Sequence, residues 1–232
     1  MPHDIDLRAL EPHDILALRD LVRFGVLADD QIARRYGDSS RATARLQLLV
    51  EGGLVGAWSD AIENTAVYSA TPAGAGVARC GLRATRPSYE HLRHDIAVVD
   101  LADYILEHEP HADFRTEREV ARVLRGGRAP TPNWGPKTYG HKPDGLVLAD
   151  GKRLAIELEH SEKSEQRYAE ICRWFALTVR VDGIRWYVDD PKTMERIRRV
   201  NEQHGYAQDV DVTYAPFPPG VVVRRWAPPR PR

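Results

Sequence analysis

The sequence has too little cysteine for a disulfide or zinc framework. Its 232 residues include only two cysteines, Cys80 and Cys172, and neither stands in a Cys-x-x-Cys motif. This spacing argues against a zinc finger and against a disulfide-stabilised secreted domain. Two isolated thiols are typical of a protein that works in a reducing compartment.

Long apolar runs and an excess of positive charge are also missing. No apolar stretch approaches the roughly 20 residues that cross a membrane as a helix. The first ten residues, MPHDIDLRAL, lack the basic start and apolar run of a signal peptide. We therefore expect a cytoplasmic protein with no membrane partner. Since 33 Lys and Arg are offset by 34 Asp and Glu, any nucleic-acid surface must be a local basic patch.

The composition that is present suits a folded protein of one large domain or two small ones. Hydrophobic residues make up 42% of the chain, which is enough for real cores. Residues 81–87, GLRATRP, combine Arg, Gly and Pro with few apolar side chains. We predict that this segment is a linker between an N-terminal domain over 1–80 and a C-terminal domain over 88–232.

The N-terminal domain is predicted to contain three helices followed by a β-hairpin. Three stretches with apolar residues at helical spacing end at Gly25, Gly37 and Gly52, and Ser39 is expected to cap the third. LVGAW and TAVYSAT then alternate as strands around a polar turn. This order of elements is that of a winged helix-turn-helix.

The third predicted helix carries polar and basic residues on the face opposite its apolar stripe. In a helix-turn-helix the second of two short helices enters the major groove. Arginine can read guanine or hold phosphate, and glutamine can read adenine. We predict that double-stranded DNA is the partner, contacted by Arg34, Arg35, Ser40, Arg41, Arg45 and Gln47. The alternative is a protein-interaction module whose surface arginines are merely solvated.

The C-terminal domain is predicted to be α/β. A long helix is expected over 88–108, then a strand or helix in FRTEREVARVL and a long Gly- and Pro-rich loop over 126–142. Asp150-Gly151 is a strong hairpin signal between two short strands. A helix around 162–178, a strand and a second helix follow. The apolar runs VDVTYAPF and GVVVRRW are expected to complete this domain.

Three carboxylates are expected to converge on the predicted hairpin. Glu157 and Glu159 lie two residues apart on one strand and therefore share a face, and hairpin pairing can bring Asp144 beside them. Such a set repels itself unless a cation lies between the groups, and oxygen ligands suit Mg²⁺ or Mn²⁺. Lys163 follows, where it could offset charge on a scissile phosphate. The alternative is a solvated edge hairpin whose glutamates are balanced by nearby lysine and arginine.

Histidines offer a second metal hypothesis. His91 and His94 lie near Asp95, and with His141 they could form a transition-metal site. Surface histidines paired with acids are commoner.

Several motifs resemble known families. The segment VYSATPAGAGVA resembles the end of the wing in winged-helix transcription regulators. Pro143-Asp144 followed by Glu157-Leu158-Glu159 resembles the PD-(D/E)xK nuclease superfamily, which has a restriction-endonuclease-like core. That resemblance implies metal binding by Asp144 and Glu157, with Glu159 in the usual lysine position and Lys163 as a migrated lysine. Glu117 or Glu119 would match an acidic residue on an earlier element.

Most of the chain resembles the replication-relaxation family of plasmid and integrative-element proteins. The resemblance covers roughly residues 10–190 and includes YEHLRHDIAVVDL, TEREV and LAIELEHSEKS. It implies a role in replication or relaxation of mobile-element DNA. Two interpretations of the second domain stay open. It is either a Mg²⁺-dependent nuclease or nickase, or a non-catalytic domain that serves dimerisation in a regulator or replication accessory factor.

Overall fold

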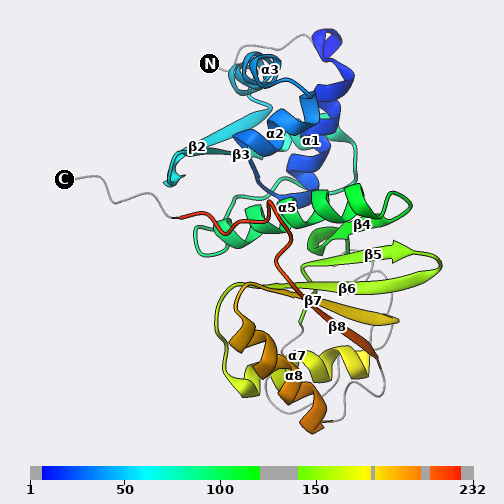
Figure 1. The fold of residues 1–232 in the computed structure, drawn as a ribbon. Helices are drawn as coiled ribbons and strands as arrows, with labels where there is room; N and C mark the ends of the chain where they lie inside the picture. Colours follow the sequence, from blue (N-terminus) through cyan, green and yellow to red (C-terminus); the bar gives the residue numbers. More distant parts are fainter. Residues whose placement is uncertain (1–6, 121–140, 179–180, 205–209, 226–232) are drawn as a thin grey trace, which may run out of the picture. The chain divides into compact units, whose positions relative to one another are not determined.

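The computed structural model describes residues 7–120, 141–178, 181–204 and 210–225, without the side chains of 59–61 and 177–178. The expected loop over 126–142 therefore lies almost wholly outside the described residues. The chain is mixed α/β with two sheets (Figure 1). Its contacts divide into one unit of residues 1–100 with 222–232 and a second of residues 101–221.

The first unit contains short helices and a three-stranded sheet. After the turn η1 (Leu7–Ala9), its helices are α1 (Pro12–Phe24), α2 (Asp29–Tyr36), α3 (Ser39–Glu51) and α4 (Pro72–Ala78). The strands β1 (Leu27–Ala28), β2 (Val55–Ile62) and β3 (Thr65–Ala70) are antiparallel in the order β1-β3-β2. The predicted order of three helices and a hairpin is confirmed.

Local signals account for the ends of these helices. Gly25 and Gly37 close α1 and α2 in the left-handed conformation, at φ 89° and 70°, which glycine adopts without a steric penalty. The predicted cap of α3 was one residue off. Asp38, and not Ser39, is the N-cap, and its carboxylate accepts a hydrogen bond from the backbone N–H of Arg41 at 2.6 Å.

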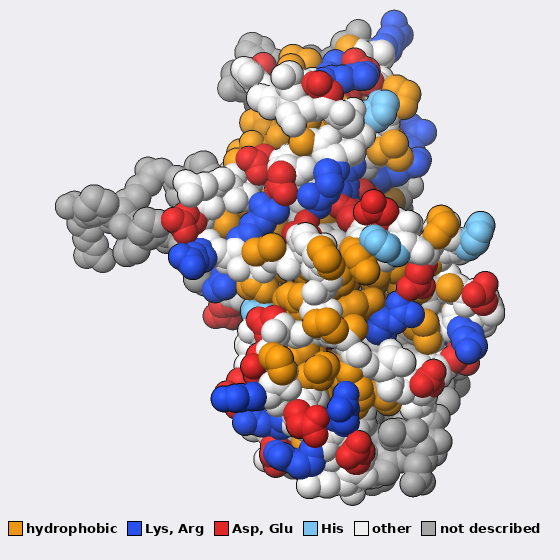
Figure 2. Space-filling view, in the orientation of Figure 1, with side chains coloured by type: hydrophobic (Ala, Val, Ile, Leu, Met, Phe, Trp, Pro, Cys, Tyr) orange, Lys and Arg blue, Asp and Glu red, His pale blue; other side chains and the backbone are white. Residues whose placement is uncertain are grey.

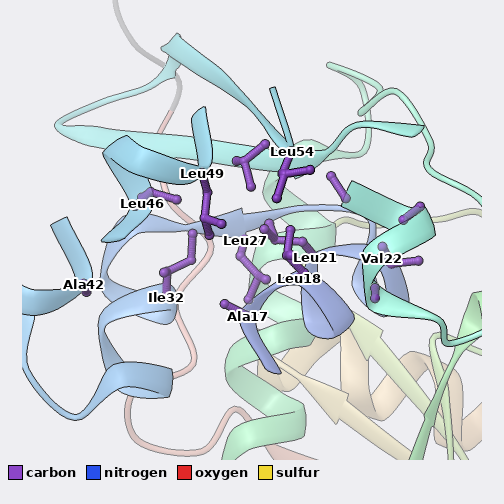
Figure 3. Close-up of a cluster of buried hydrophobic side chains, with 14 of the residues drawn as sticks. Ala17, Leu18, Leu21, Val22, Leu27, Ile32, Ala42, Leu46, Leu49 and Leu54 are labelled. Atoms are coloured by element: carbon purple, nitrogen blue, oxygen red, sulfur yellow. The ribbon is translucent and has the colours of Figure 1, made fainter. Parts of the chain in front are cut away.

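One apolar cluster joins the helices of the first unit to its sheet (Figure 3). Leu18 and Leu21 of α1, Ile32 of α2 and Leu49 of α3 point toward one another and are at most 1% exposed. The apolar residues of α3 face this cluster, so the opposite side of α3 is exposed to solvent.

The other face of the sheet packs on helix α5 (Leu92–His108). Leu92 and Ile96 join Val26, Ile62 and Val67 in a buried group. The helix predicted over 88–108 therefore begins at Leu92, and its first half belongs to the first unit by its contacts. Whether the segment 81–87 separates two folding units stays a prediction.

The second unit is built on a five-stranded mixed sheet. Its strands, in the order of the sheet, are β4 (Asp113–Thr116), β5 (Gly145–Ala149), β6 (Lys152–Glu159), β7 (Gly183–Val188) and β8 (Asp211–Pro216). The first three are antiparallel, whereas β6, β7 and β8 are parallel. Helices α7 (Glu165–Thr178) and α8 (Pro191–His204) form the crossovers and pack against β6 and β7 in a second core.

The predicted hairpin at Asp150-Gly151 is confirmed, with both residues at positive φ. The run GVVVRRW differs from its expected role. Residues 221–225 form no strand, and the segment from Val222 onward belongs to the first unit by its contacts. No helix among the described residues is long and apolar enough to cross a membrane.

Candidate functional site

The exposed face of α3 begins at its N-terminus. Ser40, Arg41, Thr43, Ala44 and Gln47 are all exposed. Their side chains are short or flexible, so a partner could approach the helix closely along this line. Gln47 donates a hydrogen bond to Glu51 one turn later, at 2.9 Å.

Arg41 and Arg45 pair with acids at the N-terminal end of α1, but in different environments. Arg41, 48% exposed, lies 2.5 Å from Glu11. Arg45 is 17% exposed and bonds to Asp14, which has no exposed surface. Tyr36 donates a further hydrogen bond to Asp14 at 2.7 Å. Burial alone would raise the pKa of Asp14, but the bonds from Arg45 and Tyr36 hold it below the usual value.

Arg34 and Arg35 of α2 are also held by carboxylates. Arg34 bonds to Asp100 at 2.6 Å and to Asp30 at 3.3 Å, and its side chain is 44% exposed. Arg35 is 10% exposed and bonds to Asp20 at 3.1 Å. Of the four predicted arginines, Arg34 and Arg41 thus present much of their surface to solvent, whereas Arg35 and Arg45 are mostly covered.

A groove of about 660 Å³ lies between α3 and the β2–β3 hairpin. Apolar residues such as Leu46, Val50 and Tyr68 line it, together with Asp29, Asp30 and Glu51. The carboxylates disfavour phosphate here, because like charges repel. A polyanion would meet the N-terminal part of α3 more favourably than the groove.

Charges are mixed across the visible surface. Figure 2 shows Lys and Arg interspersed with Asp and Glu on the face drawn. This distribution fits the formal net charge of −1. Any attraction of a polyanion must then come from local groups of basic side chains.

The acidic residues of the second unit gather at one end of the central strand β6. Gly145 of β5 pairs with Ile156, so Asp144 lies beside Glu157. The Asp144 carboxylate accepts a hydrogen bond from the backbone N–H of Leu158 at 2.8 Å. Glu157 and Glu159 share a face of β6, as predicted, and are 5% and 2% exposed. The alternative of a solvated edge hairpin was wrong, because β7 covers the other edge of β6 and these glutamates are buried.

Glu157 forms a buried pair with His141, which the motif analysis did not place in this site. The His141 Nε2 lies 2.8 Å from Glu157 Oε1, and the ring contacts Trp174 and Phe175 edge-on. Burial raises the pKa of Glu157 to about 7, and Asp144 adds to that rise while His141 opposes it. The pKa of His141 is raised as well, because Glu157 outweighs the effect of burial. Only the fold reveals this pairing, since the two partners are 16 positions apart in sequence.

Glu159 and Lys163 form the second pair of this site. The Lys163 ammonium bonds to Glu159, whose other oxygen accepts hydrogen bonds from the N–H and hydroxyl of Ser161. The Lys163 side chain is 37% exposed and therefore reaches the surface. Sequence reasoning correctly placed Lys163 near Glu159, because it lies at the start of the connection to α7.

The oxygen donors of Asp144 and Glu157 are of the kind that suits a hard divalent cation. Among the described residues no group of three or more His, Cys, Asp or Glu is placed to hold a metal. Glu159 is engaged with Lys163 and Ser161. Asp144 and Glu157 thus remain the first candidates for metal ligands, and whether Glu159 joins them stays a prediction. His91, His94 and Asp95 belong to α5 or the residues before it, in the first unit by contacts, whereas His141 pairs with Glu157 in the second.

Comparison with protein-family models, with curated proteins and with solved structures finds no match.

Proposed function

We propose that the chain is a DNA-binding protein whose first unit is a winged helix that docks α3 against double-stranded DNA. The observation that supports this is the exposed face of α3, with polar side chains that are short or flexible, in a unit that also contains a β-hairpin. A helix presented in this way can enter a major groove, which is wide enough for one helix. Ser40, Arg41 and Gln47 would face the base edges.

The four arginines divide into two roles in this proposal. Arg41 and Arg34 are exposed enough to exchange an acidic partner for a phosphate. Arg45 and Arg35 instead hold α3 and α2 against α1 through Asp14 and Asp20. Only the first two are then expected to change DNA affinity without also loosening the fold.

The test is an electrophoretic shift titration on duplex DNA with the Arg41→Ala, Gln47→Ala double variant. Loss of two groove contacts should weaken binding by several-fold to a hundredfold, on the order of 1–3 kcal/mol. Arg23→Ala, which removes a charge from α1, is the matched control and should leave affinity nearly unchanged. Equal binding by the double variant and the wild type would reject α3 as the reading helix.

The second unit supports a second candidate function, Mg²⁺- or Mn²⁺-dependent hydrolysis of a phosphodiester. The observation that favours it is the pair of adjacent carboxylates, Asp144 and Glu157, with Lys163 reaching the surface nearby. A bound divalent cation would supply charge that polarises phosphate and activates water. Asp144 and Glu157 would hold it. Glu159 would orient Lys163, whose ammonium would offset negative charge on the phosphate.

His141 has a defined part in this candidate site. Its ring holds Glu157 in one orientation through the 2.8 Å bond. It also contacts Trp174 and Phe175 edge-on, and these contacts restrict its movement away from the carboxylate. His141 is thus a positioning residue for Glu157.

The test of the catalytic candidate combines thermal unfolding with plasmid nicking. Millimolar Mg²⁺ or Mn²⁺ should stabilise the wild type by mass action, by about 1.4 kcal/mol at ten times the dissociation constant. Asp144→Asn should lose this gain, whereas Glu202→Gln, an exposed carboxylate on α8, should keep it. If metal stabilises neither protein and no nick appears, the second unit serves a non-catalytic role such as dimerisation in a DNA-binding regulator.

The biological setting follows from the resemblance to replication-relaxation proteins. In that setting the protein acts on the DNA of a plasmid or integrative element inside the cytoplasm. Either outcome of the nicking test is compatible with DNA binding by the first unit. Failure of the nuclease proposal would therefore leave the DNA-binding proposal unaffected, and the reverse also holds.

A further inference from the structure

Two arginines share two carboxylates in the first unit. Arg34 of α2 bonds to Asp100 Oδ1 at 2.6 Å and to Asp30 Oδ2 at 3.3 Å. Arg224 lies 2.9 Å from Asp30 Oδ1 and 3.8 Å from Asp100 Oδ2. All four residues belong to the first unit by their contacts. The formal charges of the two guanidiniums and the two carboxylates cancel, so each carboxylate can keep one cation if the other cation moves.

The members of this network differ in exposure. The side chain of Arg34 is 44% exposed, whereas those of Arg224 and Asp100 are 17% and 6% exposed. Gln31 donates a further hydrogen bond to Asp100 at 2.8 Å. The pKa of Asp100 is nevertheless raised, because burial outweighs the bonds from Gln31 and Arg34. A buried carboxylate of this kind is costly without a paired charge, so Arg34 can leave Asp100 at low cost only if another cation stays close.

Arg224 is held where it can supply that charge. Its two terminal nitrogens each lie 2.9 Å from a different oxygen of Asp30, and such a forked pair fixes the guanidinium in position. The next residue, Arg225, accepts a hydrogen bond through its carbonyl oxygen from the backbone N–H of Glu63 at 3.0 Å. Burial would raise the pKa of Asp30, but Arg224 and Arg34 outweigh it and hold the pKa below the usual value.

We propose that Arg224 is a positioning residue that makes Arg34 available to a backbone phosphate of duplex DNA. The inference rests on the proposed function and adds a second residue on which the phosphate contact depends. With Arg224 in place, Arg34 can turn to a phosphate while Asp30 and Asp100 keep a cation between them. Without Arg224, the same movement would leave both carboxylates unbalanced, one of them buried. The carboxylates would then hold Arg34 away from the DNA.

The experiment is a double-variant cycle of Arg34→Gln and Arg224→Gln. Binding to a duplex of mixed sequence is measured at several salt concentrations, because phosphate contacts carry no sequence information. Arg34→Gln should lower the slope of log affinity against log salt by about 1. Arg224→Gln alone should lower it by about as much, and the double variant should lower it no further. Losses that add in the double variant, or an unchanged slope for Arg34→Gln, would overturn the proposal.

A second substitution should rescue Arg224→Gln. Adding Asp30→Asn removes one of the carboxylates that hold Arg34, and should restore most of the slope and the affinity. Asp29→Asn is the matched control, because it removes the same charge from the adjacent, exposed position of α2 and should restore little. If Arg224 acted only by stabilising the fold, loss of Asp30 as well would not restore binding, and that result rejects the proposal.

The single variant Asp30→Asn gives a measurement that does not depend on the folding of Arg224→Gln. It should raise duplex affinity when Arg34 is present and leave the affinity of Arg34→Gln nearly unchanged. An equal rise in both backgrounds would show that Asp30 does not restrain Arg34, which contradicts the proposal.

The outcomes separate this inference from the proposed function. If the Arg41, Gln47 double variant weakens duplex binding but the cycle is additive or the rescue fails, the role of Arg224 is rejected while the winged helix stands. If the wild type binds no duplex, both proposals fail.

Discussion

Asp14 is a carboxylate with no exposed surface, and it accepts hydrogen bonds from side chains of two other helices and from the backbone N–H of Glu11. A buried charge is tolerated only when it is paired and bonded in this way. Arg45 and Tyr36 thus stabilise the ionised form of Asp14 and tie α1 to α2 and α3. Arg45 is therefore primarily a structural residue, independently of any contribution to DNA binding.

Asp14→Ala should therefore destabilise the protein strongly. The substitution leaves Arg45 without its buried partner, which typically costs about 3–5 kcal/mol. Arg41→Ala, on the exposed pair with Glu11, should change stability little, since solvent screens it. Urea unfolding of both variants measures the difference. Similar midpoints for the two would show that burial does not govern these pairs.

The lowered pKa of Asp14 also predicts a pH dependence. A carboxyl whose pKa is lower in the folded state stabilises the fold above its unfolded pKa. That contribution should be lost as the pH falls below about 4, near the ordinary value for aspartate. Wild type and Asp14→Asn should therefore converge in unfolding free energy at low pH. A constant difference from pH 7 to pH 3 would contradict this account.

The Glu157–His141 pair should give the free energy of unfolding the opposite pH dependence near neutral pH. Both pKa values are raised in the folded state, so the folded protein binds more protons than the unfolded chain. Stability should then fall as the pH rises from about 5 to about 7. Thermal unfolding of Glu157→Gln, which cannot ionise, should show a weaker fall over this range. Glu202→Gln, which removes an exposed carboxylate from α8, serves as the control and should keep the wild-type profile.

A neighbouring backbone group comes close enough to one glycine of α4 to exclude a side chain there, but not to another. In α4, a Cβ on Gly74 would lie 2.1 Å from the carbonyl oxygen of Leu54, whereas one on Gly76 would meet nothing within 4 Å. Thr71 caps this helix through the N–H of Gly74. The close approach at Gly74 is what lets α4 pack against the end of the hairpin.

Alanine at these two glycines of one helix should thus have opposite effects. Gly76→Ala should raise stability by about 0.5–1 kcal/mol, because alanine loses less backbone freedom in a helix. Gly74→Ala should lower it by roughly 1–3 kcal/mol through overpacking. Denaturant melts of the pair provide the measurement. A loss of similar size at both positions would mean that helix propensity, and not contact with Leu54, sets the effect.

At the scale of the whole molecule, the first unit is assembled from distant parts of the chain. Gln31 of α2 donates hydrogen bonds to the carbonyl of Ile96 and to Asp100 at 2.8 Å. Arg224 reaches Asp30 from a position 194 residues away. The predicted linker 81–87 therefore lies between two segments that belong to one unit by their contacts.

Limited proteolysis tests whether residues 81–87 separate two folding units. Cleavage is predicted first within 81–87, from its composition, leaving a fragment of about 145 residues. Because Leu92, Ile96 and Asp100 bond and pack with residues before the cut, the two fragments should co-elute in size-exclusion chromatography and separate only in denaturant. Fragments that separate under native conditions would support 81–87 as a true boundary between folding units.

Local pattern determined much of this protein from the sequence alone. Helical periodicity, the glycines that end α1 and α2, and the Asp150-Gly151 turn act over a few residues, so reading the chain in order predicts them. The shared face of Glu157 and Glu159 follows from strand alternation in the same way. Only the tertiary structure decided that Arg45 faces buried Asp14, that His141 pairs with Glu157, and that residues 222–225 return to the hairpin. These contacts join residues far apart in the chain, and their energies depend on burial, which periodicity does not reveal.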